Sequence, residues 1–128
     1  MQSLQRQLSA CCQEFQTERQ VHGLSASSVF CFPASFSGFA GHFPDRPVLP
    51  AIVQLAAIRH TAELALARPL IPAGFGRTKF QGMIPPDEKI RCTLLLKETD
   101  GLWTAAFSIR RMDNTPVANG NCTFFPEH

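Results

Sequence analysis

The sequence predicts an α+β fold in which a strongly curved antiparallel sheet wraps around one central helix. The helix is expected from about Pro50 to Ala67, and it is apolar on nearly every side in its first two turns. A helix of that kind needs cover all round, which a curved sheet can supply. Four segments after the helix have strand character, namely residues 76–84, 88–97, 102–111 and 117–125.

The strand pattern is clearest in residues 88–97 and 102–111, where apolar side chains recur with a period of two. That period is typical of a sheet with one buried face. Pro, Asp, Gly and Asn mark turns at residues 85–87, 99–101 and 113–116. Because connections this short join antiparallel neighbours, we expect the four strands to form a meander.

The segment before the helix predicts one more helix and one more strand. Apolar residues recur every three or four positions from Leu4 to Phe15, the pattern of a short amphipathic helix over a sheet edge. Residues 20–32 are rich in Val, Phe, Ser and Cys and predict a strand that Pro33 ends. A loop with Phe36 and Phe39 follows, and it is expected to fold over something apolar.

The second half of the long helix is polar and carries Arg59, His60, Thr61 and Glu63. We expect that end to reach solvent or a partner subunit. Prolines at positions 69 and 72 are expected to terminate the helix.

Length and composition predict one domain over residues 1–128, since the chain is 45% hydrophobic and carries a net charge of only +2. That charge, without a dense basic run, argues against nucleic acid as a partner. The five cysteines include no Cys-x-x-Cys pair and no zinc spacing, so we expect reduced thiols, no metal and no other cofactor. No signal peptide or membrane helix is apparent, which predicts a cytoplasmic protein with no membrane partner.

The segment that precedes the helix is a stiffened loop, because Pro44, Pro47 and Pro50 fix φ and remove backbone donors. It leads directly into the helix. The first helical amides, those of Ala51 and Ile52, lack intrahelical acceptors and suit a carbonyl oxygen or an anion. His42 stands just upstream of them.

From His42 to Ala56 the chain reads His-Phe-Pro-x-x-Pro-Val-x-Pro-x-x-x-Gln-Leu-Ala. This resembles the signature of the 3-hydroxyacyl-thioester dehydratases of fatty-acid synthesis, which have the hot-dog fold. The chain departs from the family pattern at Asp45 and Ala51, where glycines are usual. A second stretch, from Lys79 to Ile90, resembles the next strand pair of that family. The resemblance implies a substrate held on acyl carrier protein or coenzyme A, and a dimer with active sites between its subunits.

The resemblance also implies roles for individual residues. His42 would take the C2 proton, and the amides of Ala51 and Ile52 would polarise the thioester carbonyl. The substrate pocket is expected to include Phe39, Phe43, Pro44, Val48, Leu49, Gln54, Ala56 and Phe80.

The family's general acid is a Glu or Asp fourteen residues after the histidine, contributed by the facing subunit, and counting from His42 gives Ala56. Alanine cannot transfer a proton. Glu63 lies about 10 Å further along the helix, given a rise of about 1.5 Å per residue. Gln54 can hold a water or the substrate hydroxyl, whereas Asp45 beside Arg46 fits a surface ion pair.

Three functions stay open at this point. The first is a dehydratase-like enzyme for 3-hydroxyacyl thioesters, the second a hot-dog module that binds acyl thioesters or pairs with an active relative, and the third a thioesterase. The effect of Ala51 is also open. A helical φ suits alanine, whereas a required positive φ would strain it.

Overall fold

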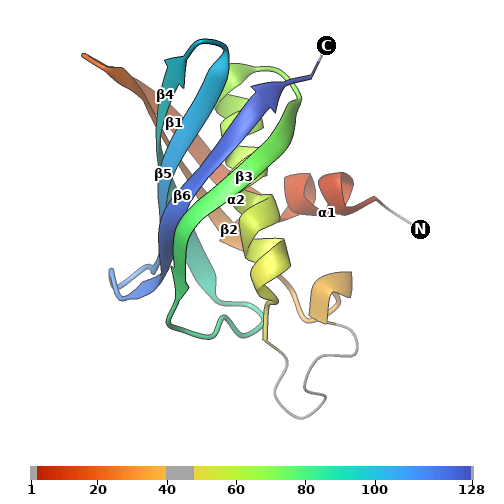
Figure 1. The fold of residues 1–128 in the computed structure, drawn as a ribbon. Helices are drawn as coiled ribbons and strands as arrows, with labels where there is room; N and C mark the ends of the chain where they lie inside the picture. The colour runs from red at the N-terminus through yellow and green to blue at the C-terminus, as the bar shows by residue number, and fades with distance from the viewer. Residues whose placement is uncertain (1–2, 40–47, 128) are drawn as a thin grey trace.

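The computed structural model describes residues 3–39 and 48–127. It contains the helices α1 (Leu4–Cys11) and α2 (Ala51–Leu66), a 3-10 turn (Ser37–Phe39), and the strands β1 (Cys12–Gln20), β2 (Gly23–Cys31), β3 (Leu70–Phe80), β4 (Lys89–Thr99), β5 (Leu102–Arg111) and β6 (Pro116–Pro126). The strands form one antiparallel sheet in the order β1-β2-β4-β5-β6-β3. Figure 1 shows this sheet curling around α2, so the predicted fold class is confirmed.

The core lies between α2 and the concave face of the sheet. Alternate residues of β4 and β5 point inward, as the period of two predicts, and those of β4 include the fully buried Ile90, Cys92 and Leu96. One polar contact crosses this core: the hydroxyls of Ser28 on β2 and Thr61 on α2 lie 2.7 Å apart, and Thr61 also donates to the Ala57 carbonyl. Buried hydroxyls satisfied in this way fix the helix against the sheet.

The long helix agrees with its predicted limits but not with its predicted surroundings. Of the polar residues in its second half, Thr61 is fully buried against the sheet, whereas Arg59, His60 and Glu63 are half-buried. The expectation that this end reaches solvent or a partner subunit therefore does not hold for Thr61. The first turn, expected to be covered on all sides, is open within the chain, because Ile52 is 76% exposed. The helix ends at Leu66, where Ala67 takes a left-handed conformation and its amide caps the Glu63 carbonyl.

The N-terminal segment contains a strand that the sequence did not predict. The amphipathic pattern was extended to Phe15, but α1 ends at Cys11 and the chain continues as β1. Most of β1 is exposed, so its polar residues show no alternation that could reveal a strand. Helix α1 itself packs against α2 and buries Leu8 there.

The meander prediction is right for β4, β5 and β6 and wrong for β3. β3 pairs with β6, at the far edge of the sheet from β1, and β4 pairs with β2 instead. β3 also begins at Leu70, before the predicted position, and runs through Pro72. An edge strand tolerates a proline, because its outward side needs no ladder hydrogen bond.

All five cysteines are free thiols, and Cys92 of β4 is fully buried. Burial raises the pKa of the Cys92 thiol to about 12 from an ordinary 9.0, and a hydrogen bond with Ser28 offsets this only in part. The unfolded chain loses this proton near 9.0 while the folded chain keeps it, so stability should decline between about pH 9 and about pH 12.

We therefore expect Cys92 to lower the free energy of unfolding by about 1.4 kcal/mol for each pH unit in that window. Urea unfolding of the wild type and of Cys92→Ala at about pH 8 and about pH 10 measures this contribution as a difference. The wild type should lose more stability than the variant over this interval. An equal loss in both proteins would assign the pH dependence to other groups.

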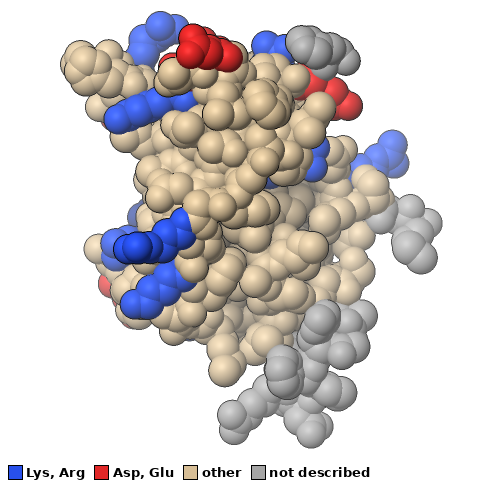
Figure 2. Space-filling view, in the orientation of Figure 1, with Lys and Arg blue, Asp and Glu red and all other residues tan. Residues whose placement is uncertain are grey.

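Within the described residues, no helix combines the length and apolar character needed to cross a membrane. On the face drawn in Figure 2, Lys and Arg side chains lie in small separate groups rather than in a continuous basic stripe.

Candidate functional site

Three of the predicted site residues, His42, Phe43 and Pro44, lie outside the described residues. The site is therefore built from the segments on either side of them. Phe39 ends the preceding segment, and Val48 begins the following one. Both Phe39 and Leu49 are buried, and the Phe39 ring packs edge-on against Phe36 with 6.0 Å between ring centroids.

The sequence predicts unpaired amides at the N-terminus of α2. Pro50 is the N-cap, and its carbonyl accepts hydrogen bonds from the amides of Val53 at 3.0 Å and Gln54 at 3.1 Å. The amides of Ala51 and Ile52 have no acceptor among the described residues, and both residues are exposed. These two donors stand at the positive end of the helix dipole and can receive a carbonyl oxygen.

The replacement of a family glycine by Ala51 causes no backbone strain. Ala51 is the first residue of α2 and does not have a positive φ. Alanine adopts helical backbone angles freely. Of the two possibilities left open by the sequence, the structure supports the unstrained one.

Gln54 has a buried acceptor that no group in the described part of the chain satisfies. Its side chain is 3% exposed, and its Nε2 donates to the Leu49 carbonyl at 3.2 Å. Its Oε1 is buried and has no hydrogen-bond partner within residues 3–39 and 48–127. An unsatisfied buried acceptor costs about 1–3 kcal/mol. Gln54 Oε1 is therefore suited to accept a hydrogen bond from a bound water or hydroxyl.

Ala56, which the sequence resemblance places at the position of the family's helix carboxylate, is half-buried. Ala56 lines a small cavity of about 60 Å³ between α1 and α2, together with Leu4, Leu8 and His60 among others. Glu63 reaches the same cavity but is already engaged: it pairs with Arg59 at 3.6 Å and accepts the Leu70 amide at 2.8 Å. These bonds support the sequence-based view that Glu63 is a poor substitute for the missing acid.

His60 is a titratable neighbour of Ala56 that the sequence argument treated only as part of a polar helix end. Its ring lies edge-on to the buried Phe30 ring, with centroids 6.1 Å apart. Burial lowers the pKa of His60, and the nearby Glu63 carboxylate opposes that effect. The spacing of four residues between Ala56 and His60 is the signal that could have revealed the proximity.

Phe80 is less clearly part of a pocket. It lies on the edge strand β3 and is exposed, and Val48 is half-buried. The grouping of Phe80 with Ala56 and the loop before α2 stays a prediction. The described residues contain no group of three or more His, Cys, Asp or Glu side chains placed to hold a metal ion.

An antiparallel six-stranded sheet curled around a central helix is the arrangement of a hot-dog protein. The chain belongs to the ApeI-like family, described as ApeI dehydratase, which matches residues 16–121.

Comparisons with individual proteins agree with this family. The dehydratase FabZ of Streptococcus pneumoniae, a 3-hydroxyacyl-[acyl-carrier-protein] dehydratase, is 29% identical over 93 residues, which are 67% of this chain and 66% of that protein. The match thus spans just under two thirds of this relative. Among solved structures, the dehydratase heterocomplex ApeI:P from Xenorhabdus doucetiae has a TM-score of 0.67 at 21% identity, covering 86% of this chain and 94% of that one. The fluoroacetyl-CoA thioesterase FlK has a TM-score of 0.71 at 13% identity, covering 87% and 90%.

Proposed function

We propose that residues 1–128 form one hot-dog domain that interconverts 3-hydroxyacyl and 2-enoyl thioesters carried on acyl carrier protein or coenzyme A. The observation that carries this proposal is the pair of amides of Ala51 and Ile52, which have no acceptor among the residues that the structure describes and follow the segment with His42. We place this activity in fatty-acid or related acyl-chain synthesis in the cytoplasm, where free cysteines persist.

The proposed reaction divides among three groups. The amides of Ala51 and Ile52 hold the thioester carbonyl oxygen and stabilise the charge that develops on it. His42 takes the C2 proton, the C3–O bond breaks, and the same imidazole returns the proton to the leaving hydroxyl, so that water and the 2-enoyl thioester form. Gln54 Oε1 accepts the hydrogen bond of that hydroxyl, which satisfies its buried acceptor.

We propose that the active assembly is a homodimer or a heterodimer with a related hot-dog protein. The family's acid comes from the facing subunit, and a homodimer of this chain places Ala56 at both acid positions. A relative with Glu or Asp at that position would complete one site per dimer. The name of the ApeI:P heterocomplex supports an assembly of two unlike subunits.

Two other functions compete with this proposal. Ala56 at the acid position favours a module that binds acyl thioesters without converting them. The likeness to FlK favours a thioesterase, in which the same amides polarise the carbonyl and His42 activates water. One experiment separates the three functions: incubation with 3-hydroxyacyl and 2-enoyl thioesters while hydration, dehydration and free thiol are followed together. Interconversion supports the proposal, thiol release alone supports a thioesterase, and binding without either reaction supports the module.

Restoring a carboxyl at position 56 tests whether the pocket still matches the family reaction. We expect Ala56→Glu to increase hydration or dehydration, because it restores the missing acid. Overpacking costs about 1–3 kcal/mol in a filled core, and the cavity of about 60 Å³ beside Ala56 should relieve part of that cost. Ala56→Gln is the matched control, with the same shape and no acidic proton. If both variants fold and gain nothing, or gain equally, position 56 does not supply the acid.

A further inference from the structure

The segment between β3 and β4, residues 81–88, has no regular structure but is tied to the sheet at both ends. At its start, the amides of Gln81 and Gly82 donate to the Val117 carbonyl on β6, at 2.8 and 3.2 Å. Near its end, the Asp87 amide donates to the Phe32 carbonyl at 2.7 Å, just beyond β2. This segment, which we call the 81–88 loop, is therefore hydrogen-bonded to β6 at its start and to the end of β2 near its own end.

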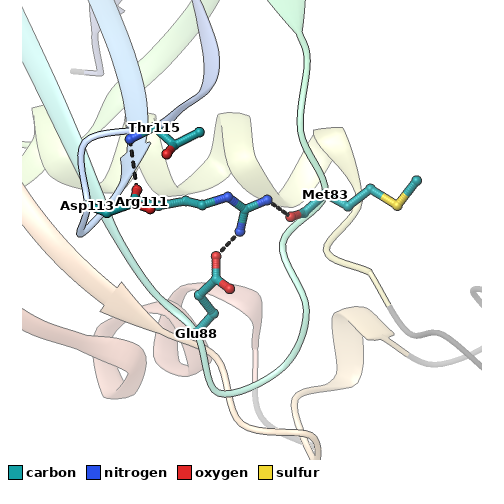
Figure 3. Close-up of polar contacts among 5 residues, drawn as sticks. All are labelled: Met83, Glu88, Arg111, Asp113 and Thr115. Carbon is teal, nitrogen blue, oxygen red and sulfur yellow. Dashed lines mark hydrogen bonds and ion pairs between the residues drawn. The ribbon is translucent and has the colours of Figure 1, made fainter.

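One side chain binds the 81–88 loop at two points. Arg111, the last residue of β5, donates from Nη2 to the Met83 carbonyl and from Nη1 to the Glu88 carboxylate (Figure 3). The two partners are five residues apart in sequence. A planar guanidinium with several fixed donors can hold both at once, which a lysine ammonium with its single nitrogen does less well.

The backbone of Arg111 is itself fixed by the turn that follows β5. Its amide donates to the Thr115 carbonyl, and its carbonyl accepts the Asn114 amide, each at 2.9 Å. Within that turn the Thr115 amide donates to Asp113 Oδ1 at 2.9 Å (Figure 3). The guanidinium therefore extends from a rigid base toward the 81–88 loop.

Between the two contacts of Arg111 lies the residue that touches the proposed site. Ile84 is fully buried, and its carbonyl accepts the Leu49 amide at 2.8 Å. The Leu49 carbonyl in turn accepts Gln54 Nε2. Leu49 is thus held through both its amide and its carbonyl. It lies two residues before Ala51, whose amide has no acceptor among the described residues.

We propose that Arg111 is a positioning residue for the thioester site. By holding Met83 and Glu88 it fixes Ile84, Ile84 fixes Leu49, and Leu49 sets the placement of the Ala51 and Ile52 amides and of Gln54. Arg111 does not touch the substrate in this arrangement. The inference rests on the proposed function, since it specifies how the carbonyl-binding amides are held in place.

The expected effect is on turnover more than on folding. The Arg111–Glu88 pair is partly exposed, and pairs of that kind contribute little to global stability. Catalytic geometry is more sensitive, since a displacement of about 1 Å can cost about 10²-fold in rate. Loss of the guanidinium should therefore lower kcat while the protein stays folded.

The test compares Arg111→Met with Arg110→Met, a matched control on the same strand. Arg110 is the neighbouring residue of β5; it donates to the Asn114 carbonyl at 3.0 Å, and no hydrogen bond or ion pair joins its side chain to the 81–88 loop among the described residues. Steady-state kinetics of enoyl-thioester hydration give kcat and KM, and hydrogen exchange of the Leu49 amide, without substrate, reports the contact with Ile84.

We expect Arg111→Met to lower kcat by about 10- to 100-fold with a smaller change in KM, and to speed Leu49 exchange by about tenfold relative to the Ile109 amide of β5. Arg111→Lys should restore part of both, and Arg110→Met should change neither. Unchanged Leu49 exchange in Arg111→Met, or equal effects of the two methionine variants, would overturn the inference. If the wild type converts no thioester, the proposed function fails, and the exchange result alone then decides whether Arg111 holds Leu49.

Discussion

Replacing His42 by alanine is expected to slow thioester turnover by about 10²–10⁴-fold, the usual contribution of a positioned acid–base group. Binding should stay nearly intact, because the amides of Ala51 and Ile52 and the acceptor of Gln54 are unchanged. The measurement is kcat with a 2-enoyl thioester beside the Kd of an unreactive acyl thioester. A fall in kcat without weaker binding identifies a group that acts in the transition state rather than in the ground state.

Two other histidines provide controls for this substitution. His22 lies in the exposed turn between β1 and β2, far along the chain from the site, and His22→Ala should leave turnover unchanged. His60 is the sharper comparison, since it lines the cavity beside Ala56. If His42→Ala retains activity and His60→Ala loses it, the base has been assigned to the wrong imidazole. If neither substitution matters in a wild type that binds thioesters, the binding-module function replaces the enzyme.

The sequence predicts the elements that obey one simple period. Apolar residues on nearly every side mark α2, and a period of two marks β4 and β5, so these elements agree with the structure in type and nearly in limits. β1 shows neither pattern, because an exposed edge strand has no face that must be apolar. The pairing of β3 with β6 could not be predicted from turn lengths, since it joins strands with β4 and β5 between them in sequence.

The same distinction applies to the candidate site. The amides of Ala51 and Ile52 follow from the rule that a helix begins with unpaired donors, which needs only local sequence. The contacts that fix those amides are long-range: Leu49 bonds to Ile84, and Ile84 is bracketed by the two contacts of Arg111. The residue types at positions 49, 84 and 111 do not predict these contacts. Only the register of the sheet brings them together.

The two edges of the sheet differ in a way that predicts where a second subunit binds. β1 carries Gln, Glu, Thr and Arg side chains on its exposed surface, and charged residues on an edge discourage pairing with another sheet. β3 instead exposes Ile71, Phe75 and Phe80 along an unpaired edge. A long edge strand with exposed apolar residues is a template for pairing. We therefore expect the dimer to form through β3.

Phe75→Lys should convert the proposed dimer into a monomer at about micromolar concentration, because it places a charge in the middle of the proposed interface. Phe75 is 54% exposed in the isolated chain, so the substitution should leave the fold intact. Sedimentation velocity measures the change, and circular dichroism checks the fold. If the active site needs both subunits, turnover should fall together with the dimer.

Phe15→Lys is the matched control, since Phe15 is 38% exposed and lies on the opposite edge strand β1. This variant should stay dimeric and active. A monomeric Phe15→Lys beside a dimeric Phe75→Lys would place the interface on β1 and contradict the argument from edge composition. A wild type that is monomeric at micromolar concentration would contradict the dimer itself. A heterodimer with a carboxylate-bearing relative would then remain. A second copy of this chain carries Ala56 as well and supplies no acid in either case. Mixing the two proteins in the same sedimentation experiment tests the heterodimer.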